Sequence, residues 1–157
     1  MGPLPQRTAM NMREMVAVAA ITLWAVVALP SGTSAGELVV AEADRAAIEA
    51  VIRHQLDALR RDDGLAAFSD ASPGVQERFG SAKIFLQMVQ EAYAPVYRPR
   101  QVQFMDLKIV RGLPVQKVFV VGPAHQRWFA FYPMRLDKEG FWRIDGCYLI
   151  LTEDSST

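Results

Sequence analysis

The segment of residues 141–151 constrains the fold more than any other stretch, because its side chains alternate with the period of a β-strand. One set of alternate positions is apolar or aromatic: Trp142, Ile144, Gly146, Tyr148 and Ile150. The other set is polar in the middle and apolar at its ends: Phe141, Arg143, Asp145, Cys147, Leu149 and Leu151. Apolar side chains on both faces favour an interior strand of a sheet. We therefore expect the rest of the chain to supply neighbouring strands, and helices that cover one face.

Length and composition favour one small domain. The 157 residues suffice for a single sizeable core. The 17 basic and 17 acidic residues form no basic stripe, so charge gives no support for a nucleic-acid or membrane-surface partner. Two histidines and one cysteine are too few for a structural zinc site or an intrachain disulfide. We expect no metal and no cofactor.

The N-terminal region has the parts of a secretory signal peptide. Arg7 and Arg13 precede an uncharged apolar run at 15–29, and small residues follow it up to Ala35. The run is shorter than the ~20 residues of a membrane-spanning helix, which favours cleavage near Ala35 over a retained anchor. We expect a periplasmic or secreted protein with no membrane contact after cleavage.

The organisation predicted for the whole chain has four parts. It is a signal peptide at 1–35, a leader at 36–43, a domain at 44–151 and a disordered tail at 152–157. The translation start is left open among three methionines, Met1, Met10 and Met12.

Helical signals occupy the first half of the domain. An apolar stripe with helical period predicts a helix over 44–61, with these side chains on its buried face: Ile48, Val51, Ile52, Leu56 and Leu59. A short helix is expected over 65–68. Ser72 before Pro73, and Ser81 before a periodic stretch, predict helices over 73–79 and 82–93. The last of these should bury five residues, Ile84, Phe85, Met88, Val89 and Ala92. Pro95 predicts an extended connection over 94–99.

Strand signals occupy the second half, at 100–111, 115–121, 126–136 and 141–151. In the first strand the apolar phase flips around Met105, which predicts a β-bulge. In the third, Trp128 and Tyr132 share one face while Phe129 and Phe131 share the other. Helices followed by an antiparallel meander predict an α+β fold. We expect a curved four-stranded antiparallel sheet wrapped around the long helix as a cone, with a cavity between helix and sheet.

Several short runs resemble an exported bacterial family, domain of unknown function 4864, for which a nuclear-transport-factor-2-like (cystatin-like) fold is proposed. The similar runs are at 55–58, 62–63, 71–73, 79–80, 93–98 and 142–147, and the last of them, from Trp142 to Cys147, is the most specific. The resemblance covers about 44–151. It implies this fold and an exported setting but no activity, because proteins of the wider fold include isomerases, dehydratases, ligand binders and dimerisation modules.

One polar residue and several aromatic ones are the candidates for a ligand site in the cone. Gln55 interrupts the apolar stripe of the first helix, so it either contacts a ligand or bonds a sheet carbonyl at a bulge. The aromatic candidates are Tyr93, Tyr97, Trp128, Tyr132, Trp142 and Tyr148. Part of the aromatic surface could also form a homodimer face on the sheet.

Other candidates have simpler structural interpretations. Asp57, Asp106 or Asp145 could act as a base with Tyr132 or Tyr148 as donor, but strand parity places Arg143 and Asp145 outward as an exposed ion pair. Cys147 is expected to be a buried structural cysteine rather than a reactive thiol. The two histidines, His54 and His125, are expected on the surface. The arginines at 98–100 either bind an anion or lie in a solvated loop.

The sequence therefore predicts a non-enzymatic exported domain. It binds a small apolar or amphipathic ligand in the cone, or a protein partner on the sheet. One alternative is an isomerase or lyase that uses a cavity carboxylate, indicated by a void lined by Gln55 plus an acid. The other is a pure dimerisation module with a filled cone.

Overall fold

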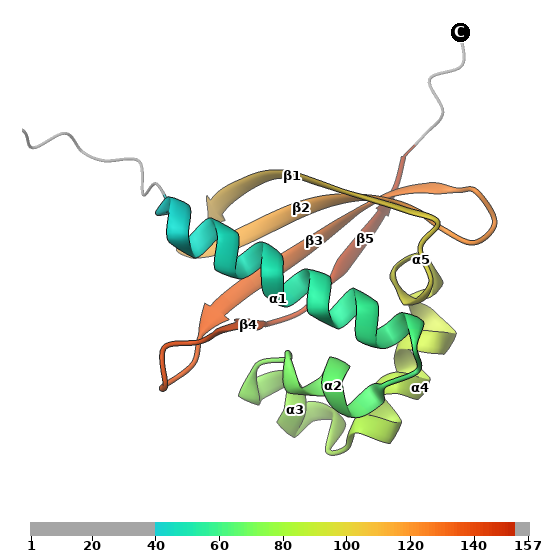
Figure 1. The fold of residues 1–157 in the computed structure, drawn as a ribbon, viewed down its shortest axis with the longest axis horizontal. Helices are drawn as coiled ribbons and strands as arrows, with labels where there is room; N and C mark the ends of the chain where they lie inside the picture. The colour runs from blue at the N-terminus through green and yellow to red at the C-terminus, as the bar shows by residue number, and fades with distance from the viewer. Residues whose placement is uncertain (1–39, 153–157) are drawn as a thin grey trace, which may run out of the picture. The chain divides into compact units, whose positions relative to one another are not determined.

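The structure, a computed structural model, describes residues 40–152, with helices in the first half and one sheet in the second (Figure 1). The helices are α1 (Glu42–Arg60), α2 (Gly64–Ser69), α3 (Pro73–Phe79), α4 (Ala82–Ala92) and α5 (Ala94–Tyr97). The strands are β1 (Gln101–Val110), β2 (Leu113–Val121), β3 (Arg127–Leu136), β4 (Trp142–Ile144) and β5 (Tyr148–Leu151). The α+β class is confirmed. The sheet has five strands rather than four, because the expected last strand is interrupted.

Helix α1 lies across one face of the sheet, as Figure 1 shows. Its stripe of Ile48, Ile52 and Leu56 is buried among inward-facing strand residues, which include Val118, Val120, Ala130, Tyr132 and Met134. Full burial of one such aliphatic side chain contributes about 1.5–3 kcal/mol, so this contact is the main reason the helix is held on the sheet.

Each of the next three helices begins at a capping side chain. Asp63 accepts from the backbone N–H of Ala66 at the start of α2. The hydroxyls of Ser72 and Ser81 likewise accept backbone N–H groups and start α3 and α4, as predicted. Gly80 ends α3 with a φ of 70°, a conformation that glycine adopts without steric cost. The capping pattern in the sequence was therefore sufficient to place the starts of α3 and α4.

Two local predictions in this region were wrong. Residues 94–97 form helix α5 rather than an extended connection, because Pro95 stands in the first turn, where a proline gives up no helical hydrogen bond. Ile84 is 54% exposed, so the buried face of α4 is narrower than expected and is centred on Phe85 and Val89.

Neighbouring strands of the sheet run antiparallel in the order β1-β2-β3-β4, with β5 also paired to β3. The register between β1 and β2 shifts between Phe104 and Leu107, which confirms the predicted bulge. There the backbone carbonyl of Met105 accepts a hydrogen bond of 3.0 Å from the buried amide of Gln116. A bulge bends its strand, so it gives the sheet curvature at this edge.

The continuous interior strand predicted over 141–151 was also wrong. β4 pairs with the end of β3 and β5 with its beginning. On its other side β4 has only a single parallel bridge, between Ile144 and Ala71, among the described residues. Between them, residues 145–147 stand opposite only two residues of β3, Tyr132 and Pro133, so the chain carries one extra residue there. Gly146 takes a φ of 153° at this point.

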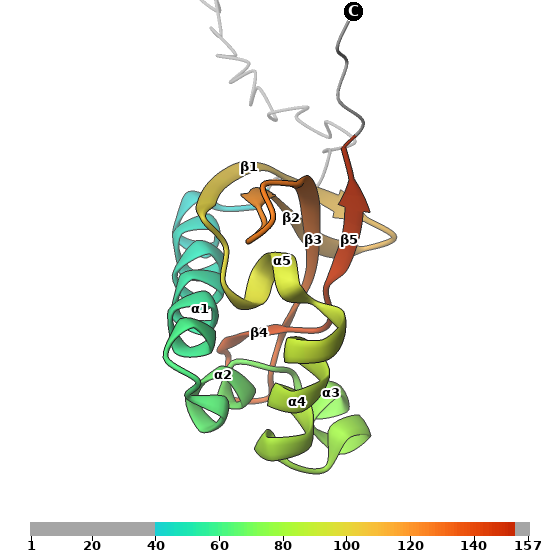
Figure 2. The same cartoon turned by 90° about the vertical axis from the view of Figure 1, so that its right-hand side faces the viewer.

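The extra residue reverses which side chains face inward. Before it, Ile144 is buried; after it, Leu149 packs on the core, while Tyr148 is 65% exposed. The sequence hid this reversal, because a glycine can belong to either face. In Figure 2 the β4 segment runs between the sheet and the short helices α2 to α4.

Candidate functional site

A cavity of about 350 Å³ opens beside the break between β4 and β5. This lies at the lower end of the range usual for small-molecule sites. Its lining comes from helices α1, α3, α4 and α5, from strands β3, β4 and β5, from the break itself and from the segment before α3. The lining residues are Gln55, Leu59, Ala71, Val75, Arg78, Phe79, Phe85, Met88, Val89, Tyr93, Val96, Tyr132, Ile144, Asp145, Gly146, Cys147 and Tyr148. The interruption that ends the regular strand is therefore also what borders the cavity.

The helical wall of the cavity is apolar and well packed. Phe85 is buried, and its ring lies 5.3 Å from that of Phe68 and 5.7 Å from that of Phe79, the second pair edge to face. Such ring contacts restrict side-chain movement. The helices therefore present a fixed apolar surface, of the kind that takes the body of a small molecule.

Tyr132 is the most unusual residue of the lining. Only 1% of its surface is exposed, yet within residues 40–152 its hydroxyl meets no nitrogen or oxygen partner, and the Cys147 thiol, a weak hydrogen-bonding group, lies beside it. Burial raises the pKa of this phenol well above its ordinary value, and a neighbouring thiol adds to the shift. A buried hydroxyl without a partner costs about 1–3 kcal/mol. The phenol is therefore a neutral donor whose oxygen is itself buried next to the cavity.

Cys147 supplies the neighbouring thiol. The residue is partly buried, and burial raises the pKa of its thiol to about 12, although the Tyr132 hydroxyl acts in the opposite direction. The thiolate is the nucleophilic form, so this side chain is a poor nucleophile at neutral pH. The low reactivity fits the structural role predicted for Cys147, although the residue is partly exposed rather than buried.

Asp145 is the one carboxylate of the lining, and neighbouring groups already engage both of its oxygens. Ser72 donates to Oδ1 at 2.6 Å, and Arg135 donates to Oδ2 through two N–H groups at 3.1 and 3.0 Å. Burial by itself would raise the pKa of Asp145, but these partners hold it below the ordinary value. The predicted exposed pair with Arg143 is wrong, since the Asp145 side chain is 21% exposed and Arg143 pairs with Asp137 at 2.8 Å.

Gln55 lies in the wall, where the sequence alternatives were a ligand or a sheet carbonyl. Its amide nitrogen instead donates to the backbone carbonyl of Ala67 in helix α2 at 2.9 Å. Its amide oxygen accepts no hydrogen bond from any residue that the structure describes. Gln55 therefore ties α1 to α2 and keeps one acceptor available.

The seven predicted ligand residues fall into two groups. Gln55, Tyr93, Tyr132 and Tyr148 line the cavity, whereas the other three lie outside its lining. Of these three, Trp142 donates to Asp44 at 3.0 Å, Tyr97 bonds Asp62, and Trp128 is packed against the core.

Two carboxylates considered as bases also lie outside the cavity lining. Asp57 pairs with Arg60 at 3.3 Å and Asp106 with Lys108 at 3.1 Å, both at the surface. Of the three carboxylates considered as bases, Asp145 is therefore the one that lies in this cavity.

Sequence reasoning missed the contribution of α3 and α4 to the site. Val75, Arg78 and Met88 line the cavity, but their helices carried only capping and packing signals. Gly146 was the usable signal, because an isolated glycine in a strand pattern often marks a bulge beside a functional site.

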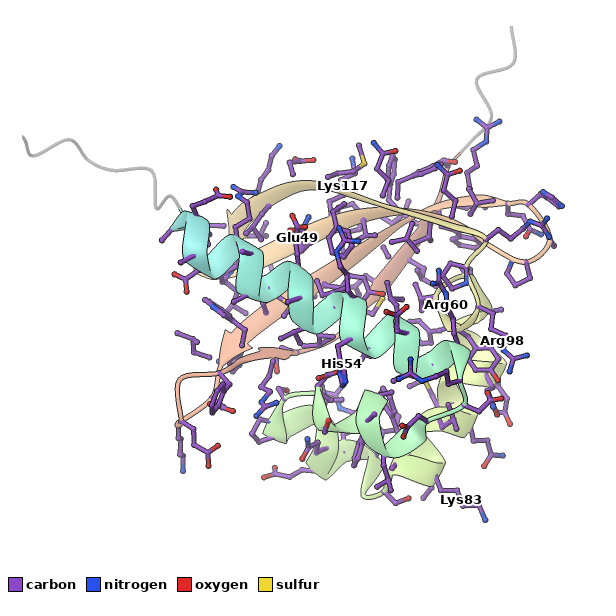
Figure 3. The ribbon with its side chains drawn as sticks, viewed as in Figure 1. Glu49, His54, Arg60, Lys83, Arg98 and Lys117 are labelled. Carbon is purple, nitrogen blue, oxygen red and sulfur yellow. The ribbon has the colours of Figure 1, made fainter. Side chains whose placement is uncertain are left out.

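The remaining candidates form contacts away from the cavity. His54 is exposed, as predicted, but its ring nitrogen lies 2.7 Å from a carboxylate oxygen of Asp70, and Figure 3 shows it on the side of α1 that faces the short helices. His125 is exposed in its turn, also as predicted. Arg98 pairs with Asp62 at 2.7 Å at the far end of α1, so it is an ion-paired surface residue.

Two classes of site are absent from residues 40–152. No cluster of three His, Cys, Asp or Glu side chains there could hold a metal ion. The helices in this range are too short or too polar to cross a bilayer.

Comparison with known proteins gives one result. No curated protein and no solved structure matches the chain. The model of one protein family, described as Domain of unknown function (DUF4864), matches residues 41–157. This range includes all five helices and the whole sheet. The chain therefore belongs to the family Domain of unknown function (DUF4864).

Proposed function

We propose that this domain binds a small amphipathic molecule in the cavity beside the β4–β5 break and catalyses no reaction on it. The single observation that supports binding is Tyr132 in the lining of the cavity, because its buried hydroxyl has no nitrogen or oxygen partner among the described residues. Buried polar groups in proteins nearly always have a partner, and a ligand oxygen would supply it. The apolar helical wall would take the rest of the molecule.

The residues expected for the enzyme alternative are present, since Gln55 and the carboxylate of Asp145 both line the cavity. The state of that carboxylate argues against catalysis. Asp145 is ion-paired with Arg135 and accepts hydrogen bonds on both carboxylate oxygens. Its pKa is lowered, so it is a weak base. A catalytic base near neutral pH needs a raised pKa instead.

Native mass spectrometry of gently purified protein tests the binding proposal. Wild-type protein should carry a reproducible non-covalent adduct, whose mass begins to identify the ligand. Val75→Phe adds volume to the α3 wall and should reduce the adduct, whereas the control Ile150→Lys changes an exposed residue outside the lining and should keep it. A bare wild-type protein, or an adduct unchanged in Val75→Phe, contradicts the proposal.

A second candidate function is homodimerisation through the outer face of the sheet. Phe119 and Phe129 stack edge to face there at 6.0 Å, and Tyr148 and Ile150 are exposed beside them. Exposed aromatic patches are common at interfaces. Sedimentation velocity at rising concentration should show a dimer that Ile150→Lys disrupts. A wild-type monomer at all concentrations would exclude this function.

We also propose that the protein is exported, on the strength of the signal-peptide pattern in residues 1–35, which lie outside the described residues. Intact mass of the protein from the periplasmic fraction should correspond to a chain that begins at Gly36. A species that retains residues 1–35 contradicts cleavage.

We further propose that the domain is a variant of the nuclear-transport-factor-2-like fold. The long α1 against a bulged antiparallel sheet supports this. An experimentally determined structure compared with proteins of that fold tests the proposal, and a different order of helices and strands in space would refute it.

A further inference from the structure

The mouth of the cavity has an unbalanced positive charge. Arg78 and Asp145 are the charged side chains in the lining. The charge of Asp145 is already compensated by the two N–H groups of Arg135, which lies on β3. With Arg78 and Arg135 set against the one carboxylate of Asp145, one of these two arginines is left over.

Arg78 is that arginine. It stands in the last turn of α3, is exposed, and makes no hydrogen bond or salt bridge with any residue from 40 to 152. It is close enough to Asp145 to help stabilise that carboxylate, so it lies on the same side of the mouth. A planar guanidinium that makes no hydrogen bond to a described residue is suited to bind a carboxylate or sulfonate through two parallel hydrogen bonds.

The two polar features lie at different depths. The Tyr132 hydroxyl is buried, whereas Arg78 is exposed at the rim. The apolar helical wall, which includes Val75, Phe85 and Val89, lines the same cavity. A molecule that satisfies all three has an anionic head at the mouth, an apolar body, and an uncharged oxygen at its inner end.

We propose that the ligand is an amphipathic organic anion whose acid group pairs with Arg78 and whose inner oxygen accepts from Tyr132. This inference rests on the proposed ligand-binding function. It narrows the ligand class to apolar carboxylates or sulfonates that carry a further oxygen.

A matched pair of fluorescent dyes tests the anionic part. Anilinonaphthalene sulfonate and phenylnaphthylamine share one aromatic skeleton, and only the first is charged. Wild-type protein should bind the sulfonate more tightly than the uncharged dye. Arg78→Gln should weaken binding of the sulfonate about fivefold, which is the effect of losing an exposed ion pair of about 1 kcal/mol. Added salt should also weaken binding of the sulfonate but not binding of the uncharged dye.

The control is Lys83→Gln, which removes the same charge from an exposed residue of α4 outside the lining, labelled in Figure 3. It should leave both dyes unchanged. Two results overturn the anion inference while cavity binding stands. In the first, the two dyes bind with equal affinity and Arg78→Gln has no effect. In the second, Lys83→Gln and Arg78→Gln lose equal amounts of affinity for the sulfonate. Failure of both dyes to bind, or binding of both that Val75→Phe does not reduce, overturns the proposed function itself.

Discussion

Tyr132 combines deep burial with a hydroxyl that has no partner among the described residues, an arrangement that lowers the stability of the fold. Phenylalanine would fill the same space without this cost. A sequence that keeps the tyrosine departs from the rule that buried polar groups are paired, and such departures are concentrated at functional sites.

Tyr132→Phe should therefore raise the free energy of unfolding by about 1 kcal/mol while it weakens ligand binding. Tyr97→Phe is the matched control, because the Tyr97 hydroxyl bonds both Asp62 and Gln90 at the surface. It should lower stability by about 0.5–1 kcal/mol. Urea denaturation of the three proteins measures both changes. A loss of stability in Tyr132→Phe would mean that the hydroxyl has a structural partner.

Cys147 should react slowly in the folded protein. Folding raises the pKa of its thiol from 9.0 to about 12, so at about pH 8 the thiolate fraction falls by about a thousandfold. Alkylation by iodoacetamide, followed by mass, should be slow in buffer and fast in urea. Because the folded pKa is raised, the thiol stabilises the fold fully below pH 9.0 and loses this effect as the pH rises toward about 12. Rapid alkylation of folded protein contradicts this assignment.

At the scale of elements, the break between β4 and β5 shapes the site. One extra residue separates the two strands, and Asp145 anchors the break by bonding Ser72 at the start of α3 and Arg135 on β3. The same break places Cys147 and Tyr148 at the cavity. A regular strand would have given none of these residues its present direction.

Glycine-to-alanine changes at two positions should have opposite signs. Gly146 has a φ of 153°, so Gly146→Ala should destabilise the fold by about 1 kcal/mol through backbone strain, although nothing within 4 Å blocks a methyl group. Gly74 lies in α3, where Gly74→Ala should stabilise by about 0.5–1 kcal/mol. Thermal unfolding compares the variants. Equal effects at both positions contradict the strained backbone at Gly146.

At the scale of the whole described domain, α1 joins two apolar clusters. Ile48, Ile52 and Leu56 pack on the sheet, whereas Ala58 and Leu59 pack among the short helices. Because one rigid helix belongs to both clusters, neither can lose its packing without affecting the other. We expect the helical and sheet parts to unfold together.

Ile52→Ala tests this coupling. Ile52 is fully buried, so the substitution should cost about 3 kcal/mol and shift the helical and tryptophan signals to the same lower denaturant concentration. Ile84→Ala, at an exposed position of α4, should change stability by less than about 0.5 kcal/mol. Separate transitions for the two signals would show that the clusters are independent.

Elements whose causes are local could be predicted from the amino-acid sequence. The serines at 72 and 81 fixed two helix starts, the apolar period fixed the buried face of α1, and the phase flip near Met105 fixed the β1 bulge. Each depends on interactions within a few residues, or on a repeating pattern that one buried face imposes. These sufficed for the α+β class and for four of the seven residues expected in the cavity, Gln55, Tyr93, Tyr132 and Tyr148.

The position of the break in the last strand, and its role in the cavity, became visible only in the packed fold. Gly146 fits either strand face, so the alternation of residues 141–151 concealed the extra residue. Three features depend on residues far apart in the chain: the burial of the Tyr132 hydroxyl, the bonds of Asp145 and the position of Arg78 at the cavity. A sequence pattern records which side chains face a core, whereas polar partners and cavities arise only when separate elements are packed together.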